Sequence, residues 1–251
     1  MYHRKIVIIP TYNESENIEE MIQKIMDLIG DFELLVIDDN SPDGTGQLVK
    51  NTQPNFPGRL HLIERTGKLG LGTAYITGFQ WALRTGYDYI FEMDADFSHN
   101  PDDLIRLYNA CADANFDLAI GSRYITGVNV VNWPMGRVLM SYFASIYVKF
   151  ITGLPVKDAT AGFKCYHRSV LEAIQLDQVK FIGYAFQIEM KFTTWKLGFK
   201  LIEVPIIFTD RTKGTSKMSR GIFKEAVFGV ILMKLKSIFN PYKISQNGSN
   251  G

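Results

Sequence analysis

Short apolar runs alternate along this chain with longer stretches in which apolar residues recur at helical spacing. Helical spacing is clearest after the first run, at Ile18, Met21 and Ile22, and further helices are predicted over 73–83 and 101–114. Strands are predicted at 5–9, 34–38, 60–63, 89–93, 118–121, 163–166 and 201–208. This alternation predicts the α/β class, with a mostly parallel sheet covered by helices on both faces.

The size and composition fit one large domain. The chain has 251 residues, of which 46% are hydrophobic, enough to bury a substantial core. Its two cysteines, Cys111 and Cys165, lie far apart and outside any C-x-x-C pattern, so we expect buried thiols in a reducing compartment rather than a disulfide or zinc site. The apolar stretch before Pro10 is too short for the core of a signal peptide, which favours a cytoplasmic location.

The last part of the sequence is cationic, although the net charge of the whole chain is only +1. Between 211 and 243 the single acid is Glu225, and the basic residues are Arg211, Lys213, Lys217, Arg220, Lys224, Lys234, Lys236 and Lys243. The apolar run 226–233 is far below the roughly 20 residues of a spanning helix, so 219–243 is predicted to form an amphipathic helix at a membrane surface. A core-packed helix with a solvated basic face fits these residues equally well.

These patterns divide the chain into three parts. A folded domain is expected over 1–218, followed by the helix over 219–243. The polar tail over 244–251 is expected to be disordered.

Two carboxylates one residue apart, Asp94 and Asp96, follow the apolar run 89–93. Residues two apart on an extended chain point to the same side, so both carboxylates can turn toward one divalent ion that bridges a diphosphate. This spacing indicates metal-assisted transfer from a nucleotide-activated donor. Taken alone the motif is weak, because Asp is also common in solvated turns.

Polar clusters also follow two other predicted strands. Residues 10–14 follow the first strand, and Asp38 and Asp39 follow the apolar part of the second. In a parallel sheet the ligand site lies beyond the carboxyl ends of the strands, so these clusters and the acidic pair are predicted to converge at one edge. Tyr12 offers a ring face and a hydroxyl, and Asp39 is a charged acceptor for a ribose hydroxyl or a base edge.

A diphosphate also requires positive charge, and the candidates for it are Arg123, Arg137, Arg211 and Lys217. Isolated basic residues are usually solvated surface, so sequence position alone supports none of them strongly. For Arg123 and Arg137, ordinary salt bridges compete closely with contact to a phosphate.

Five motifs occur in order between about residues 5 and 220. They are Pro10-Thr11-Tyr12-Asn13-Glu14, Asp38-Asp39-Asn40-Ser41-Pro42-Asp43-Gly44-Thr45, Gly70-Leu71-Gly72-Thr73-Ala74-Tyr75, Met93-Asp94-Ala95-Asp96-Phe97-Ser98-His99, and Asp210-Arg211 with Gly214, Ser216 and Lys217. At these spacings they resemble the dolichol-phosphate (polyprenyl-phosphate) mannosyltransferases of glycosyltransferase family 2. The resemblance implies a GT-A fold and inverting transfer of mannose from GDP-mannose to a polyprenyl phosphate, assisted by Mg²⁺ or Mn²⁺.

The resemblance also implies a location and partners. Some members of the family carry C-terminal transmembrane helices that this sequence lacks, so it resembles the soluble catalytic form. Such a form is expected to be a peripheral protein at the cytoplasmic face of a membrane. The resemblance is also compatible with a membrane-anchoring partner protein. No nucleic-acid partner is expected.

Carried over position by position, the resemblance implies where the donor binds. The nucleotide pocket falls on Pro10, Tyr12, Glu14, Ile37 and Asp39, and the metal and diphosphate fall on Asp94, Ala95 and Asp96. Arg211 and Lys217 match the basic pair of the late motif and are expected to hold phosphates, whereas Arg123 and Arg137 are candidates for the acceptor phosphate. Ser98 stands where some bacterial and archaeal relatives have a Gln that helps to bind the ion; Ser is a weaker, neutral ligand whose place water can take.

Asp158, in Asp158-Ala159-Thr160-Ala161-Gly162-Phe163, occupies the place of the family's acceptor-loop acid. It is a candidate for contacting the sugar or positioning the acceptor, and capping a turn before the next strand is at least as well supported. The apolar segment 138–151 is a candidate for contact with lipid beside the C-terminal helix, with core packing as the alternative.

No His or Glu stands out as a general base, and the acceptor explains why. A phosphate monoester has a second pKa of about 6, so its oxygen is already an anionic nucleophile at neutral pH. The reaction then needs alignment and charge neutralisation. The residues expected to act in it are Asp96, Asp158, Arg211 and Lys217, with Asp94 beside Asp96 at the ion.

Four alternatives were weighed against this interpretation. A dinucleotide-binding turn at Gly70-Leu71-Gly72 is disfavoured, because Tyr75 replaces the third glycine and the turn does not follow the first strand. A phosphohydrolase with Asp94 as a covalent nucleophile leaves the clusters at Tyr12 and Asp39 unexplained. A non-catalytic nucleotide-binding protein would keep the same pocket, and a polyprenyl-phosphate glucosyltransferase using UDP-glucose is the nearest rival enzyme.

Overall fold

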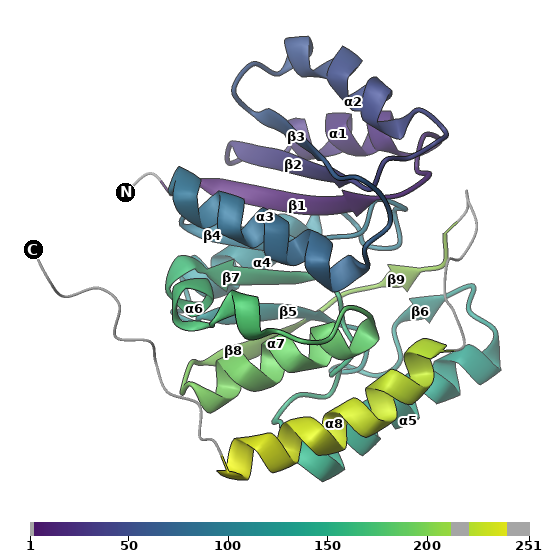
Figure 1. Cartoon of the computed structure of the whole chain (residues 1–251), viewed down its shortest axis with the longest axis vertical. Helices are drawn as coiled ribbons and strands as arrows, with labels where there is room; N and C mark the ends of the chain where they lie inside the picture. Colours follow the sequence, from purple (N-terminus) through teal and green to yellow (C-terminus); the bar gives the residue numbers. More distant parts are fainter. Residues whose placement is uncertain (1–2, 212–220, 240–251) are drawn as a thin grey trace, which may run out of the picture.

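A twisted sheet runs through the middle of the molecule, with helices on both of its faces (Figure 1). The computed structural model describes residues 3–211 and 221–239. The strands are β1 (Lys5–Thr11), β2 (Phe32–Asp38), β3 (Leu60–Glu64), β4 (Tyr89–Glu92), β5 (Leu118–Ser122), β6 (Val130–Val131), β7 (Lys164–His167), β8 (Leu201–Pro205) and β9 (Phe208–Thr209). The α-helices are α1 (Ile18–Met26), α2 (Thr45–Thr52), α3 (Leu71–Thr85), α4 (Asp103–Ala112), α5 (Met135–Thr152), α6 (Arg168–Ala173), α7 (Tyr184–Lys196) and α8 (Gly221–Phe239).

The order of the main sheet places three strand ends side by side. It reads β3-β2-β1-β4-β7-β5-β8, and β1 is parallel to both β2 and β4. The chain moves from β1 to β2 and β3 on one side and then returns to place β4 on the other side of β1. This reversal is the point at which open α/β sheets bind ligands, beyond the carboxyl ends of the strands.

The predicted sheet is confirmed as mostly parallel, with one exception. β7 runs antiparallel to both of its neighbours, β4 and β5. A second, two-stranded sheet pairs β6 with β9. The predicted strand 201–208 is divided, because β8 ends at Pro205 and β9 begins at Phe208 in the other sheet.

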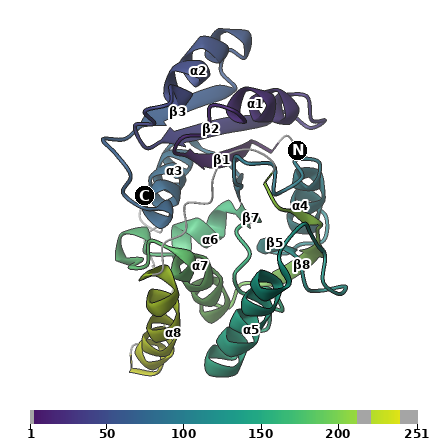
Figure 2. The same cartoon turned by 90° about the vertical axis from the view of Figure 1, so that its right-hand side faces the viewer.

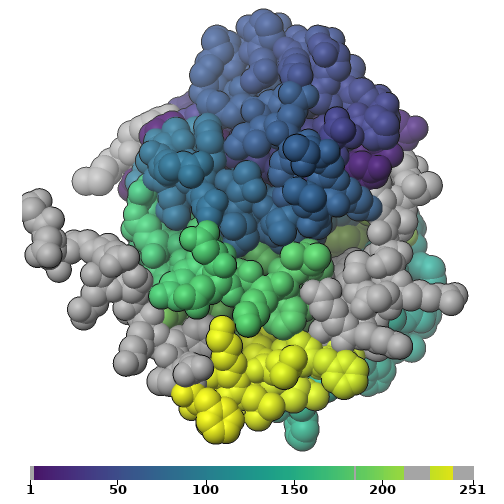
Figure 3. All heavy atoms as spheres, viewed as in Figure 1, coloured from purple at the N-terminus to yellow at the C-terminus, as the bar shows by residue number. Residues whose placement is uncertain are grey.

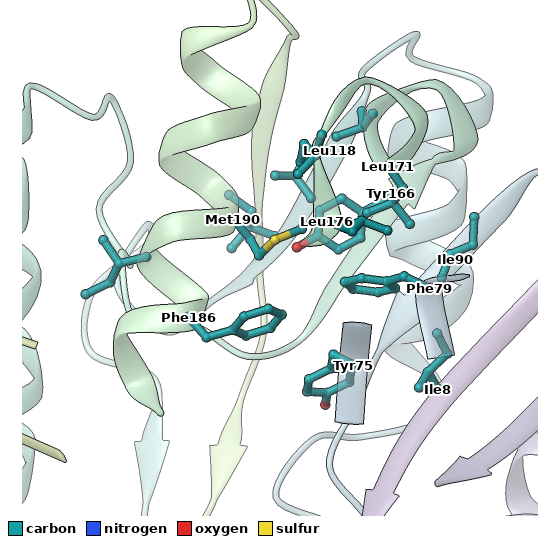
Figure 4. Close-up of a cluster of buried hydrophobic side chains, with 14 of the residues drawn as sticks. Ile8, Tyr75, Phe79, Ile90, Leu118, Tyr166, Leu171, Leu176, Phe186 and Met190 are labelled. Atoms are coloured by element: carbon teal, nitrogen blue, oxygen red, sulfur yellow. The ribbon is translucent and has the colours of Figure 1, made fainter. Parts of the chain in front are cut away.

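Both faces of the sheet are buried, which explains the uninterrupted apolar runs. In β1, Ile6 and Ile8 point into the core beneath α3, α6 and α7, whereas Val7 and Ile9 point into the core beneath α1, α2 and α4 (Figure 2). Figure 4 shows the first core, in which the rings of Tyr75 and Phe186 stack 5.9 Å apart. Gly78 lets α3 approach β1, since a Cβ there would lie 2.7 Å from Ile8 Cγ2.

Helices α5 and α8 lie next to each other below the sheet, and α8 forms the lower end of the face seen in Figure 3. The Tyr147 hydroxyl of α5 donates a hydrogen bond to the carbonyl of Val227 in α8, at 2.9 Å. Val230 and Met233 of α8 are buried in the same core as α3 and α7. The C-terminal helix is therefore packed on the domain.

The described part of α8 also exposes apolar side chains. Phe228, Leu232 and Ile238 are 65%, 63% and 61% exposed, while Lys234 turns back and donates a hydrogen bond to the carbonyl of Thr152 at 3.3 Å. Within the described part of the helix, apolar side chains thus occupy the outer surface as well as the packed one. None of the helices within 3–211 and 221–239 is long and apolar enough to cross a membrane.

Candidate active site

The residues after β1, β2 and β4 lie together at the carboxyl edge of the sheet. The backbone N–H of Asp39 donates a hydrogen bond to the carbonyl of Thr11 at 3.0 Å, and the N–H of Met93 donates to the carbonyl of Ile8 at 3.2 Å. These backbone contacts hold the residues after β2 and β4 against β1. The structure therefore brings Tyr12, Asp39 and the acidic pair to one edge.

Asp38 shapes the loop after β2. Its Oδ1 accepts hydrogen bonds from the hydroxyls of Thr11 at 2.8 Å and Ser41 at 2.6 Å, and its Oδ2 accepts one from the Ser41 N–H at 2.9 Å. A Cβ at Gly46 would lie 3.2 Å from this Oδ2, so the helix that follows is close as well. The carboxylate of Asp38 is used within the protein, and Asp39 is the acid of this pair that remains for a ligand.

Asp39 is held by Arg65, a residue that the sequence analysis missed. Arg65 Nε donates to Asp39 Oδ1 at 2.6 Å, and its Nη1 donates to the Thr73 hydroxyl at 2.8 Å. Arg65 follows β3 and pairs across from Asp39, because the register matches Asp38 with Glu64. The only sequence signal was this position, one residue beyond a strand neighbouring β2. Arg65 joins the Asp38-Asp39 motif to the Gly70-Leu71-Gly72-Thr73 motif.

The remaining expected nucleotide contacts differ in their access to a ligand. Glu14 is nearly buried and is fixed by Asn17, whose Nδ2 donates to Glu14 Oε2 at 3.1 Å. The ring of Tyr12 is only partly exposed and lies 5.0 Å from Lys68 Nζ. Pro10 is partly exposed, whereas the side chain of Ile37 is fully buried in the core. Ile37 is therefore not open to a ligand in this structure.

The two carboxylates of the acidic pair have different surroundings. The side chain of Asp94 is 41% exposed, whereas both oxygens of Asp96 are engaged. Asp96 Oδ1 accepts from the N–H of Ser98 at 3.1 Å and from its hydroxyl at 2.5 Å. Asp96 Oδ2 lies 2.8 Å from Arg211 Nη2. Ser98, expected as a third metal ligand, is itself buried and directs its hydroxyl to Asp96.

The electrostatics of this pair favour a cation. Partial desolvation and the negative charge of Asp96 raise the pKa of Asp94 from 3.8 to about 7, while Arg211 acts in the opposite direction. Two carboxylates this close repel each other, and a positive charge between them relieves the repulsion. Arg211 already supplies one such charge at Asp96.

His99 is a second residue that the sequence analysis did not assign. Its buried ring stacks on Phe163 at a centroid distance of 4.9 Å, and its Nδ1 accepts a hydrogen bond from the backbone N–H of Asp94 at 3.4 Å. Burial lowers the pKa of His99 to about 4, so the ring is neutral at physiological pH. His99 thus orients the backbone of the acidic pair without adding charge.

Asp158 and Arg123 form a buried ion pair. Asp158 Oδ2 accepts from Arg123 Nε at 2.7 Å, and Oδ1 accepts from Nη2 at 2.6 Å. Burial alone would raise the pKa of Asp158, but the charge and hydrogen bonds of Arg123 lower it. Because Asp158 is 0% exposed, its carboxylate is not open to a sugar in this structure, which leaves positioning of the acceptor and a purely structural role.

Two other expected basic residues, Arg137 and Arg211, both contact Asp210. Arg137 Nη1 donates to Asp210 Oδ1 at 2.9 Å, and its guanidinium carbon lies 4.1 Å from the centroid of the Trp133 ring. The backbone N–H of Arg211 donates to the same oxygen of Asp210 at 3.2 Å. Lys217 lies outside the described residues.

The donor set at this edge fits a hard divalent cation bound together with a diphosphate. Mg²⁺ and Mn²⁺ prefer oxygen ligands, and Mg²⁺ at such sites often takes only one or two carboxylates besides phosphate oxygens and water. Asp94 and Asp96 provide those carboxylates. Among the residues that the structure describes, no group of three His, Cys, Asp or Glu side chains is placed to hold a metal by itself.

Sequence comparison places this chain among sugar-transferring enzymes. The profile of Glycosyl transferase family 2 matches residues 6–175. The polyprenol monophosphomannose synthase of Mycolicibacterium smegmatis is 48% identical over 227 residues, which are 90% of this chain and 85% of that protein. The undecaprenyl-phosphate mannosyltransferase of Micrococcus luteus is 46% identical over 227 residues, or 90% and 92% of the two chains.

Two solved structures share the fold at low sequence identity. Glucosyl-3-phosphoglycerate synthase from Mycobacterium tuberculosis, in complex with Mn²⁺, UDP and glucosyl-3-phosphoglycerate, matches with a TM-score of 0.67 and 19% identity over 94% of this chain and 79% of that chain. A mannosyltransferase from Pyrobaculum calidifontis, in complex with GDP-Man and Mn²⁺, matches with a TM-score of 0.59 and 21% identity. That match covers 96% of this chain and 66% of the other.

Proposed function

Because the chain belongs to glycosyl transferase family 2 and is a glycosyltransferase of the GT-A fold, we propose that it transfers mannose from GDP-mannose to a polyprenyl phosphate with inversion at the sugar carbon. The observation that carries this proposal is the 48% identity to a polyprenol monophosphomannose synthase over 90% of the chain. Membership of the family sets aside the phosphohydrolase and non-catalytic alternatives. UDP-glucose remains the rival donor.

The strand-end cluster supports a nucleoside diphosphate sugar as donor. Asp39 has one oxygen fixed by Arg65, and it makes no other side-chain hydrogen bond within the described part of the chain. Its second oxygen is available to accept from a base edge or a ribose hydroxyl. Asp94 and Asp96 would hold Mg²⁺ or Mn²⁺ at the diphosphate, where the ion would neutralise charge on the leaving group.

The proposed reaction needs no protein base. An anionic oxygen of the acceptor phosphate forms a bond to the anomeric carbon of mannose, and the bond from that carbon to the diphosphate breaks, so GDP leaves with the electron pair. Attack opposite the leaving group inverts the configuration. We propose that Arg211, Arg137 and Arg123, which are paired with Asp96, Asp210 and Asp158 in this structure, align the two anionic substrates. The same role is proposed for Lys217.

The outer surface of α5 and α8 supports action on a lipid at a membrane. Its exposed apolar residues are Met135, Leu139, Met140, Tyr142, Phe143, Ile146 and Phe150 of α5, and Phe228, Ile231, Leu232, Leu235, Ile238 and Phe239 of α8. Exposed apolar side chains gathered on two neighbouring helices usually mark an interaction site. We propose that it rests on the cytoplasmic face of a membrane, either directly or beside a membrane-anchoring partner protein.

One assay tests the proposal. The protein is incubated with a short polyprenyl phosphate and Mg²⁺ or Mn²⁺, together with either GDP-mannose or UDP-glucose, and the lipid product is identified by mass spectrometry and NMR. Mannosyl phosphate lipid of inverted configuration, formed only with the divalent ion, is the expected result. A product from UDP-glucose alone would assign the rival donor, and free mannose without a lipid product would contradict transfer to the phosphate.

A further inference from the structure

The loop between α5 and β7 is held from two sides by charges of opposite sign. Glu203 of β8 accepts hydrogen bonds from the backbone N–H groups of Lys157 and Asp158, both at 2.8 Å. Lys191 of α7 donates to the carbonyls of Ala159 at 2.9 Å and Ala161 at 2.6 Å. The carboxylate of Glu203 thus accepts from two N–H groups of the loop, and the ammonium group of Lys191 donates to two of its carbonyls.

Both charges match the dipoles of the peptide groups that they contact. An N–H carries partial positive charge and a C=O carries partial negative charge, and hydrogen bonds to ionised groups are the stronger ones. Glu203 is further fixed by the Ser122 hydroxyl, which donates to it at 2.7 Å. Together Lys191 and Glu203 form a clamp on residues 157–161.

Burying the ammonium group of Lys191 at this position carries a large desolvation free energy. Its side chain is fully buried, and its remaining donor goes to the carbonyl of Gln187 at 3.1 Å, so its protons serve backbone oxygens and no carboxylate. Burial, followed by repulsion from Lys164, lowers the pKa of Lys191 well below its usual value. An apolar residue of similar length would avoid this desolvation cost, which indicates that holding the loop is what Lys191 contributes.

The clamped loop carries the groups that fix Arg123. Asp158 and Thr160 both bind the guanidinium, the latter through its hydroxyl at 2.8 Å. Movement of this loop would therefore disturb Arg123 directly.

We propose that Lys191 and Glu203 are positioning residues for the acceptor side of the reaction, which hold the 157–161 backbone so that Asp158 keeps Arg123 oriented toward the acceptor phosphate. This rests on the proposed function for the role of Arg123. The donor side is braced separately, by Arg65 and the loop after β2.

Hydrogen exchange tests the clamp without any activity measurement. In Lys191→Met, the amides of 157–162 are expected to exchange about tenfold faster or more, because their carbonyl-side anchor is lost. Lys196→Met makes the same chemical change on the same helix at a residue whose ammonium group lies over Trp195, and it should leave this loop unchanged. Unaltered exchange of 157–162 in Lys191→Met would overturn the proposal.

Kinetics separate a positioning role from general stabilisation. Lys191→Met should lower kcat/KM for the polyprenyl phosphate by about tenfold or more, while the Kd for GDP changes by less than about twofold. Equal losses in acceptor kinetics and GDP affinity, or a lower Tm with unchanged acceptor kinetics, would assign a structural role only. Lys196→Met should match the wild type in each measurement.

A second variant covers the case in which Lys191→Met does not fold. Glu203→Gln keeps the size of the side chain but removes the charge and one of the two acceptors, so it should raise exchange at Lys157 and Asp158 and weaken the acceptor step in the same way. Wild-type rates for this loop and for acceptor kinetics in Glu203→Gln would also overturn the proposal. If the wild type transfers no sugar to any polyprenyl phosphate, the proposed function fails, and the exchange measurements still decide the clamp.

Discussion

Arg211 Nη2 lies 2.8 Å from Asp96 Oδ2, at a carboxylate that is proposed to bind the divalent ion. This edge of the sheet therefore holds a positive charge before any ion is present. A bound ion and Arg211 must share Asp96 or exchange there. Arg211 is also proposed to contact the donor phosphates, which gives it a second partner when the donor is bound.

Removing the positive charge of Arg211 should strengthen binding of the ion in the absence of nucleotide. Two like unit charges about 4 Å apart repel by about 1 kcal/mol in bulk water and by more near a protein surface, so Arg211→Gln should tighten Mn²⁺ binding by about fivefold or more. Titration of Mn²⁺ followed by electron paramagnetic resonance measures this. Arg106→Gln, which removes a surface pair with Asp103, is the matched control, and weaker Mn²⁺ binding by Arg211→Gln would contradict the competition.

Asp96→Ala should abolish metal-dependent transfer and leave the fold intact. The side chain contacts Ser98 and Arg211 at the sheet edge and lies outside the apolar cores. We expect kcat to fall by about 10³-fold or more, as for other groups that hold a catalytic ion, with an unchanged circular dichroism spectrum. Undiminished turnover would remove Asp96 from the metal site.

Binding of the ion should depend on pH because Asp94 must lose a proton first. Its pKa is raised to about 7, so below that pH the ion displaces a proton, and Mn²⁺ affinity should fall by up to about tenfold per pH unit. Above pH 7 the affinity should level off. Asp94→Asn should bind more weakly at pH 8 and lose most of this dependence between pH 5.5 and 7, and a parallel pH profile in the variant would assign the dependence to another group.

The same shift predicts an effect on stability of opposite direction. A raised pKa means that the folded state binds the proton more tightly than the unfolded chain, so the stabilising contribution is fully present below about pH 4, is lost as pH rises from there to about 7, and changes no further above that pH. Asp94→Asn should therefore raise the Tm at pH 8 and raise it by less at pH 5. Thermal unfolding without metal at the two pH values measures this; a lower Tm at pH 8 would contradict it. If the Tm rises at pH 8 as expected, Asp94 is a residue that serves binding and lowers the stability of the fold.

Arg65→Lys should weaken nucleotide binding although it keeps the charge. Lysine cannot contact Asp39 and Thr73 together as the fork of Arg65 does. We expect the Kd for GDP to rise by about tenfold, measured by isothermal titration calorimetry. In an Asp39→Asn background, Arg65→Lys should raise the Kd for GDP little further, because the carboxylate that Arg65 orients is gone. If the effects of the two substitutions on the Kd are fully additive, Arg65 acts by another route.

Charges placed on the outer surface of α5 and α8 should reduce binding to lipid vesicles. Phe143 and Leu232 are 60% and 63% exposed, so Asp is tolerated there by the fold. Each loses about 1.5–3 kcal/mol of apolar burial at a membrane, or about tenfold or more in partitioning. Ile29→Asp changes an 86% exposed residue between α1 and β2, at the far end of the molecule from α8 (Figure 1), and should bind vesicles like the wild type; equal losses in all three variants would exclude a localised surface.

The sequence was informative where a side chain follows directly from its strand. β1 to β5 lie close to their predicted positions. β3 is a half-buried edge strand, whereas the residues of β1, β2, β4 and β5 are mostly apolar and buried on both faces. Asp39, Asp94 and Asp96 were identified because each directly follows such a strand or lies within a few residues of its end. The convergence of these acids needed only the parallel arrangement of the first strands.

Other features depend on tertiary contacts that leave little pattern in the sequence. α7 was not predicted, because Gln187 and Lys191 are buried alongside Phe186 and Phe192 and no polar face alternates with an apolar one. Arg65 could be recognised only from the register of β2 and β3. The pairing of Asp158 with Arg123 could be recognised only once the loop before β7 is known to lie beside the end of β5. Charged residues of this kind look alike in sequence whether they meet substrate or each other.

Val230 and Met233 of α8 are buried in the same core as the sheet, which would fix the orientation of the molecule if α5 and α8 rest on a lipid surface as proposed. The helix cannot tilt or lift away without opening that core, so the sheet edge with Asp94 stands at a set height and angle above any bilayer that α5 and α8 rest on. The depth at which the helices settle in that bilayer would then set how far the site lies from a lipid phosphate.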